Sequence, residues 1–146
     1  MKYHGYSGAV ANIRGNAQYP LLRGSVRFLP RREGTLVVAQ IRGLPETATG
    51  FFGFHIHEGA SCGGVDFSGT GGHFNPTGSP HPGHAGDLPP LLRVGGKAFL
   101  AVLTDRFCPE DVIGKTVVLH AAPDDFTSQP AGNAGQKIAC GEIHRM

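Results

Sequence analysis

Seven short runs rich in β-branched and aromatic residues, each bounded by glycine or proline, most strongly constrain how this chain folds. They span residues 8–13, 24–30, 35–44, 50–57, 96–105, 114–120 and 136–144. Alternation is clearest in the second run, where Val26 and Phe28 lie on one face of an extended strand and Arg27 lies on the other. Seven or eight strands in 146 residues predict an all-β sandwich or closed barrel that forms a single domain over residues 1–146.

The composition agrees with a globular protein and argues against several classes of partner. Apolar residues make up 40% of the chain and charged residues 16%, and the formal net charge of +2 is too small to indicate a nucleic acid or an anionic membrane as partner. No apolar run approaches the roughly 18 residues of a membrane span. The first residues contain no apolar stretch of the secretory type, which predicts a cytoplasmic protein; an exported protein whose signal has been removed is the alternative.

Two long irregular stretches, residues 58–95 and 121–135, separate the predicted strands and are rich in glycine, proline, aspartate and serine. Loops longer than roughly 12–15 residues are uncommon in a compact domain unless they are functional or disordered. The chemistry of this protein is therefore expected in these two stretches.

The first long stretch carries three histidines and a carboxylate within 15 positions: His73, His81, His84 and Asp87. Three imidazole nitrogens and one carboxylate oxygen form a donor set that suits a tetrahedral zinc ion. A metal would also take the place of the apolar core that this stretch lacks. The alternative is a solvated surface loop rich in histidine, glycine and proline.

The segment GFHIHE carries two histidines one residue apart, His55 and His57. Side chains alternate along a strand, so both point to the same face, about 6–7 Å apart. Two histidines do not fill a coordination shell. His120, at the end of the run 114–120, and one histidine from the first long stretch would complete a set of four nitrogens that suits copper. Hydrogen-bonded structural roles are the alternative for these histidines.

Five segments, taken in chain order, resemble those of the copper/zinc superoxide dismutases: GFHIHE, GGHFNP, HAGDLP, IGKTVVLH and GNAGQKIACG. The resemblance extends over nearly the whole chain. It implies a flattened eight-stranded Greek-key β-barrel of sandwich-like architecture. It also implies that the protein binds copper and zinc and converts superoxide to dioxygen and hydrogen peroxide by redox cycling of the copper.

The same resemblance assigns the ligands of both metals. The implied copper ligands are His55, His57, His73 and His120. The implied zinc ligands are His73, His81, His84 and Asp87. His73 belongs to both sets, so its imidazolate would bridge copper to a structural zinc, detach from copper on reduction and carry a proton. Asp124 matches a carboxylate that hydrogen-bonds one ligand of each metal and thereby fixes the orientation of both rings.

The resemblance also concerns the cysteines and the assembly. Cys62 and Cys140 match the pair that forms the intrasubunit disulfide of the family, which leaves Cys108 as a thiol. Many members of the family are homodimers, so a homodimer is expected here.

The chain departs from the family in the channel that leads to copper. Lys137 stands where the family usually has a catalytic arginine; lysine keeps the positive charge but lacks the planar fork of donors. The segment 121–131 is shorter than usual and contains two aspartates but no lysine or glutamate. These departures predict a reduced rate. The alternative function is a dismutase-like protein that stores or buffers copper and zinc with weak or no activity; a module stabilised by zinc alone would leave His55, His57 and His120 unexplained.

Overall fold

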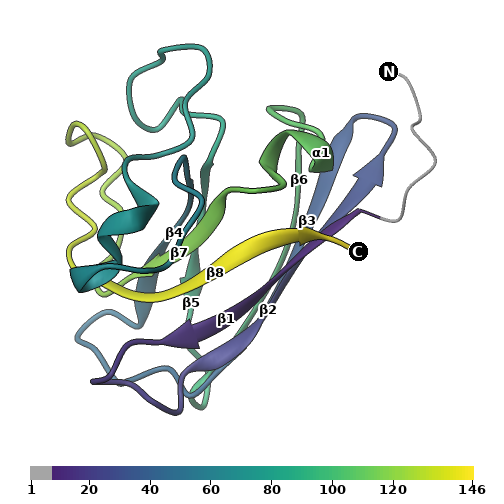
Figure 1. The fold of residues 1–146 in the computed structure, drawn as a ribbon. Helices are drawn as coiled ribbons and strands as arrows, with labels where there is room; N and C mark the ends of the chain where they lie inside the picture. The colour runs from purple at the N-terminus through teal and green to yellow at the C-terminus, as the bar shows by residue number, and fades with distance from the viewer. Residues whose placement is uncertain (1–7) are drawn as a thin grey trace.

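The structure, a computed structural model, describes residues 8–146 and consists mainly of β-strands joined by loops (Figure 1). The strands are β1 (Ala9–Gly15), β2 (Arg23–Arg31), β3 (Gly34–Arg42), β4 (Phe51–His57), β5 (Asp87–Leu92), β6 (Lys97–Thr104), β7 (Thr116–His120) and β8 (Lys137–Arg145). The helical segments in this range are a 3-10 helix, η1 (Val65–Thr70), and one turn of α-helix, α1 (Pro109–Val112). Neither helix is long or apolar enough to cross a membrane.

All eight strands belong to one antiparallel sheet with the order β5-β4-β7-β8-β1-β2-β3-β6. β3 pairs with β6 and β4 pairs with β7, so the chain crosses between neighbours that are not consecutive in sequence, as in a Greek key. The two end strands, β5 and β6, also contact each other. The sheet therefore curls into a nearly closed barrel, which confirms the eight-stranded Greek-key fold (Figure 1).

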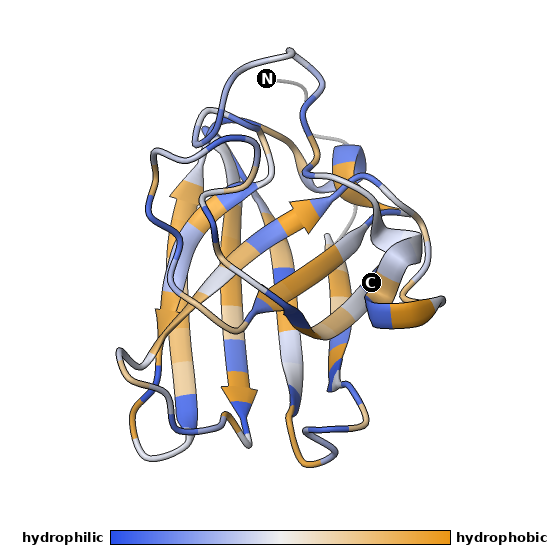
Figure 2. Ribbon diagram, turned by 90° about the vertical axis from the view of Figure 1, so that its left-hand side faces the viewer, coloured by the Kyte–Doolittle hydropathy of each residue, from blue (hydrophilic) through white to orange (hydrophobic). Residues whose placement is uncertain are grey.

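Buried apolar side chains from every strand fill the interior of the barrel. Val26 and Phe28 are fully buried and Arg27 between them is only partly buried, as the alternation predicts. Figure 2 shows hydrophobic residues concentrated on the strands, while the connecting loops are largely hydrophilic. On β4 the core positions are Phe52, Phe54 and Ile56, so the residues between them face outward, toward the loops.

The stretch 58–95 is more ordered than the sequence predicts, because it contains η1 and the whole of β5. The strand β5, with the sequence DLPPLL, was not predicted because it includes Pro89 and Pro90, and proline is a poor strand residue. Among the described strands β5 is an end strand and pairs only with β4. The N–H groups that proline lacks therefore remove no hydrogen bond from the interior of the sheet. The second long stretch, 121–135, contains no strand or helix, as predicted.

A disulfide joins Cys62 to Cys140, with 5.9 Å between their Cα atoms, as the resemblance implies. It links the beginning of the first long loop to β8 across 78 residues of chain. In the chain-entropy view, a crosslink over so long a loop stabilises the fold by about 4–5 kcal/mol. The Cys62 backbone N–H also donates to Glu142 Oε2 on β8 at 3.1 Å. The beginning of the first long loop is therefore held against β8.

Candidate metal centre

The first long loop folds back onto β4 and is held there by backbone hydrogen bonds. Phe74 N donates to Ile56 O, and Ile56 N donates to Gly86 O, both at 2.8 Å. Next to them an isolated antiparallel bridge pairs His57 with His73. Phe74 is buried and adds an apolar anchor to this contact. The loop thus brings its first histidine beside the outward face of β4.

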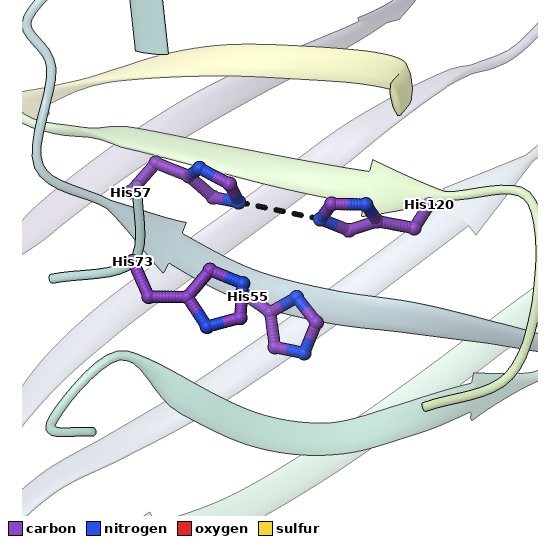
Figure 3. Close-up of side chains that lie close together, drawn as sticks. All are labelled: His55, His57, His73 and His120. Carbon is purple, nitrogen blue, oxygen red and sulfur yellow. Dashed lines mark hydrogen bonds between the residues drawn. The ribbon is translucent and has the colours of Figure 1, made fainter. Parts of the chain in front are cut away.

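Four imidazole rings meet on this outward face, from β4, β7 and the first loop (Figure 3). They are His55, His57, His73 and His120. The ring centroids of His55 and His73 are 4.1 Å apart, and those of His57 and His120 are 5.4 Å apart. One ring nitrogen from each residue lies within 4.8 Å of the others. A register shift between Leu119 and His120 lies at the end of β7, where His120 joins this group.

The hydrogen bonds of His57 and His120 show that their facing nitrogens are both acceptors. His57 Nδ1 lies 2.7 Å from Gly71 O and His120 Nδ1 lies 3.1 Å from Gly135 O. A carbonyl oxygen only accepts, so each Nδ1 must donate and each neutral ring then carries its lone pair on Nε2. The two Nε2 atoms are 3.2 Å apart (Figure 3). Two lone pairs at this separation repel each other unless a cation lies where both point.

A second group consists of His73, His81, His84 and Asp87. His73 Nδ1 lies 2.8 Å from Asp87 Oδ1 and 3.1 Å from His84 Nδ1. Asp87 Oδ2 lies 3.1 Å from His81 Nδ1 and 3.3 Å from His84 Nδ1. Ligands bound to zinc at about 2.0–2.1 Å in a tetrahedron are about 3.3 Å apart. The donor set and its separations therefore fit a zinc ion.

Three buried ring nitrogens find no hydrogen-bond partner among residues 8–146: His55 Nδ1, His73 Nε2 and His81 Nδ1. A buried polar atom without a partner costs free energy and needs an explanation. Each of these atoms belongs to a residue of one of the two groups, and a bound metal would satisfy all three. The first group, with four imidazole nitrogens, fits copper, and the second fits zinc.

His73 is the residue that the two groups share. Its Nδ1 lies among the donors of the second group, at 2.8 Å from Asp87 Oδ1, while its Nε2 has no polar partner in the described part of the chain and its ring lies against those of His55 and His57. One imidazole ring thus presents a nitrogen to each group.

Asp124, from the second long loop, forms a hydrogen bond with one histidine of each group. Its carboxylate oxygens lie 2.8 Å from His55 Nε2 and 2.8 Å from His81 Nε2, and its side chain is only 1% exposed. An ionised carboxylate only accepts, so both Nε2 atoms donate and both Nδ1 atoms keep their lone pairs for a metal. His55, His81 and Asp124 are close enough to form a third group of metal-binding atoms, but these hydrogen bonds already occupy them.

Burial keeps three histidines of the first group, His55, His57 and His120, neutral. It lowers the pKa of His55 and that of His57 from 6.5 to about 2, and the pKa of His120 to about 4. Burial also lowers the pKa of His84. Burial alone would raise the pKa of Asp87, but the hydrogen bond with His73 and the neighbouring histidines lower it overall. Neutral imidazole and ionised carboxylate are the forms that bind metals.

Lys137 lies at the start of β8, next to the first group. Its Nζ donates to Thr70 Oγ1 at 2.7 Å and to Gly71 O at 3.1 Å. Gly71 O also accepts the hydrogen bond from His57 Nδ1, so one carbonyl connects the ammonium group to a histidine of the first group. Partial burial lowers the pKa of Lys137. The charge is therefore held in a defined place beside the four imidazoles.

Three residues that no sequence pattern marks as site residues hold the second group, which we call the zinc-type group, in place. The Gln129 side chain pairs with the backbone of His81, donating at 2.7 Å and accepting at 2.8 Å. Arg106 Nη1 donates to Pro82 O at 2.8 Å and to His84 O at 3.0 Å. A Cβ on Gly132 would collide with Asp124 Oδ1 and lie 2.6 Å from His81 Nε2. No sequence pattern marks Arg106 or Gln129, because both act on backbone atoms far away in the chain.

The fold and the two groups define a class of protein: a Greek-key barrel whose outer face carries six histidines and one aspartate arranged for two metals, with one histidine common to both. The sequence model described as "Copper/zinc superoxide dismutase (SODC)" matches residues 22–143. The chain therefore belongs to the copper/zinc superoxide dismutase family.

Individual relatives agree with this assignment. "Superoxide dismutase [Cu-Zn]" of Deinococcus radiodurans is 37% identical over 140 residues, which cover 81% of this chain and 75% of that protein. "Superoxide dismutase [Cu-Zn] 2" of Aquifex aeolicus is 34% identical over 135 residues, covering 82% of this chain and 78% of the relative. A crystal structure of a SOD-like protein from Bacillus subtilis superposes with a TM-score of 0.76 at 28% identity, covering 91% of this chain and 96% of that one.

The depressed pKa values predict that the metal-free protein loses stability in acid. Below about pH 6.5 the unfolded chain binds protons at His55 and His57 that the folded chain does not bind, so the free energy of unfolding falls as pH falls, by about 1.4 kcal/mol per pH unit for each such histidine. Urea unfolding of the metal-free protein between about pH 7.5 and pH 5 measures this slope.

Two variants separate this effect from general acid sensitivity. His57→Gln removes one of the buried histidines whose pKa is depressed and should flatten the pH dependence. His144→Gln changes an exposed histidine on β8 and should leave the slope unchanged. A free energy of unfolding that stays constant over this pH range in the unsubstituted protein would contradict the prediction.

Proposed function

We propose that this protein is a superoxide dismutase that converts two superoxide anions and two protons into dioxygen and hydrogen peroxide. The observation that carries the proposal is the position of His73, which offers one ring nitrogen to each of two groups of metal-binding side chains. Storage of copper and zinc at separate sites would not require a shared ring. The family's name and the names of the relatives support the same activity.

The chemistry of the two sets of donor atoms indicates which metal each set would bind. His55, His57, His73 and His120 would hold copper, and His73, His81, His84 and Asp87 would hold zinc. When bound, copper supplies a one-electron redox couple, and zinc, with its filled d shell, supplies charge without redox chemistry. Asp124 fixes one ring of each group by hydrogen bonds at 2.8 Å and so orients both sets of ligands.

The chain's own residues then have two tasks, to attract an anion and to supply a proton. Lys137 provides a positive charge beside the first group of histidines, where it raises the local concentration of superoxide. His73 Nε2 is buried and has no hydrogen-bond partner among residues 8–146, so whenever no metal occupies it this nitrogen can take up a proton and release it to the reduced substrate. His84 and Asp87, which lie next to Nδ1, keep the ring in place while Nε2 gains or loses its proton.

Compartment and assembly are further parts of this proposal. The disulfide between Cys62 and Cys140 favours the exported alternative over a cytoplasmic protein, because disulfides persist mainly in oxidising compartments. Phe99 and Leu103 are 67% and 58% exposed on the outer face of β6, and they support a homodimer by offering an apolar surface to a second subunit. We also propose that residues 1–146 form a single domain.

Dismutation is tested on protein that has been loaded with copper and zinc and whose metal content has been measured. We expect superoxide to be consumed catalytically, with one equivalent of dioxygen and one of hydrogen peroxide formed from two of superoxide. Protein loaded with zinc alone is the control and should show no turnover. Full copper and zinc content without turnover would contradict the proposal and favour metal storage or buffering.

Charge reversal at Lys137 should reduce the rate because superoxide is an anion. We expect Lys137→Glu to lower the rate by about tenfold or more at low salt, Lys137→Ala to lie between it and the unsubstituted protein, and Lys137→Arg to match or exceed the latter. Added salt should slow the unsubstituted enzyme because it screens the attraction.

The matched control for this series is Arg31→Glu, which makes the same charge change at the distant end of β2. Rapid-mixing decay of superoxide, normalised to bound copper, measures all of these variants. Equal rates for the arginine, alanine and glutamate variants would show that Lys137 takes no part in attracting the substrate.

A further inference from the structure

Four basic residues lie side by side at one level of the barrel, on four neighbouring strands. The strand register pairs Arg14 of β1 with Arg23 of β2, Arg23 with Arg42 of β3, and Arg42 with Lys97 of β6. All four are exposed. Since neighbouring strands are about 4.8 Å apart, the four residues extend over about 14 Å. We refer to Arg14, Arg23, Arg42 and Lys97 as the basic row.

Nothing in the described fold neutralises the basic row. Strands β1, β2, β3 and β6 contain no aspartate or glutamate. Within residues 8–146 no carboxylate forms an ion pair with any member of the row, and the sequence before residue 8 contains no acidic residue. Like charges directly opposite each other on adjacent strands destabilise a sheet. The fold thus carries a repulsion that an anionic ligand would relieve.

The row borders a groove with further hydrogen-bonding groups. The groove has a volume of about 380 Å³ and is lined in part by Asn12, Arg14, Arg23, Ser25, Gln40 and Arg42. Asn12, Ser25 and Gln40 lie directly opposite one another on β1, β2 and β3, two positions from the arginines. A line of guanidinium groups therefore runs parallel to a line of amide and hydroxyl donors. Arginine forks and neutral donors together are the groups that bind phosphate oxygens.

The shape of the row indicates a narrow, flexible ligand. The row crosses four strands of a curved barrel, so a chain that follows the curvature reaches all four charges, whereas a flat membrane does not. Proteins that bind single-stranded nucleic acids combine a basic groove with several aromatic side chains on which the bases stack. Beside the row only Phe99, opposite Gln40, offers an exposed ring within the described part of these four strands. The surface therefore fits a chain of phosphates without bases.

The basic row is separate from the metal centre. The ligands of both groups come from β4, β7, the start of β5 and the loop that precedes it, and none comes from β1, β2, β3 or β6. In Figure 1 the loops of the metal centre gather at the upper left, while the start of β2 and the end of β3, where the basic row crosses these strands, lie toward the bottom. A ligand on the row would leave the approach to the four imidazoles open.

We propose that the basic row is a binding site for a linear phosphate polymer, of which inorganic polyphosphate is the simplest member. The polymer lies across β1, β2, β3 and β6, with its phosphates on Arg14, Arg23, Arg42 and Lys97. Bound in this way, the protein stays attached to the polymer while its metal centre remains accessible.

The test measures binding of the metal-loaded protein to inorganic polyphosphate at several salt concentrations. We expect binding that weakens steeply with salt, as counterions are released by each phosphate contact. The double variant Arg23→Gln/Arg42→Gln should bind roughly tenfold more weakly at low salt and show a shallower salt dependence. Its melting temperature should equal or exceed that of the unsubstituted protein because a repulsion has been removed, and its dismutation rate should not change.

The matched control is Arg31→Gln/Arg32→Gln, which removes the same charge at the turn between β2 and β3 and should keep its affinity. Equal weakening in both double variants would overturn the proposal, since net charge alone would then explain binding. No measurable binding of polyphosphate by the unsubstituted protein would also overturn it. Tighter binding to single-stranded nucleic acid of equal charge, at the same salt, would reject the phosphate polymer in favour of a nucleic acid.

Discussion

The buried carboxylate of Asp124 is the contact on which the metal centre depends. It comes from a loop without regular structure, yet it accepts hydrogen bonds from His55 on β4 and His81 in the first long loop, both at 2.8 Å. Because both Nε2 atoms donate to Asp124, both Nδ1 atoms keep their lone pairs and face the metal-binding groups. Gly132 lies so close behind the carboxylate that any side chain there would displace it. One aspartate thereby joins two loops and a strand.

The barrel was predictable from the sequence because its strands follow simple patterns, whereas the assembly of the site was not. Alternation predicted that Val26 and Phe28 share one face of a strand and that His55 and His57 share one face of another, and both pairs do so. β5 was missed since Pro89 and Pro90 are tolerated only at the end of a sheet, which is a property of the topology. The convergence of His73 and His120 on β4 likewise depends on strand order, and only the family resemblance anticipated it.

Local charge in this protein differs from what the net charge suggests. A formal charge of +2 gave no reason to expect an anionic polymer as partner. Strand register nevertheless places four unneutralised cations in one row on the barrel, and a fifth, Lys137, beside the imidazoles. Acidic residues lie instead outside the four strands of this row, and two of them, Asp87 and Asp124, face histidines of the two metal-binding groups. We propose that the two basic regions act on different anions, a polymer and superoxide.

We propose that His73 bridges two different metals, and anomalous scattering from crystals of the reconstituted protein can locate both ions. Maps calculated from data at the copper and zinc absorption edges identify each ion. We expect one copper among His55, His57, His73 and His120 and one zinc among His73, His81, His84 and Asp87, bound to opposite nitrogens of the His73 ring. A single metal per chain, or two metals that do not share His73, would contradict the proposal.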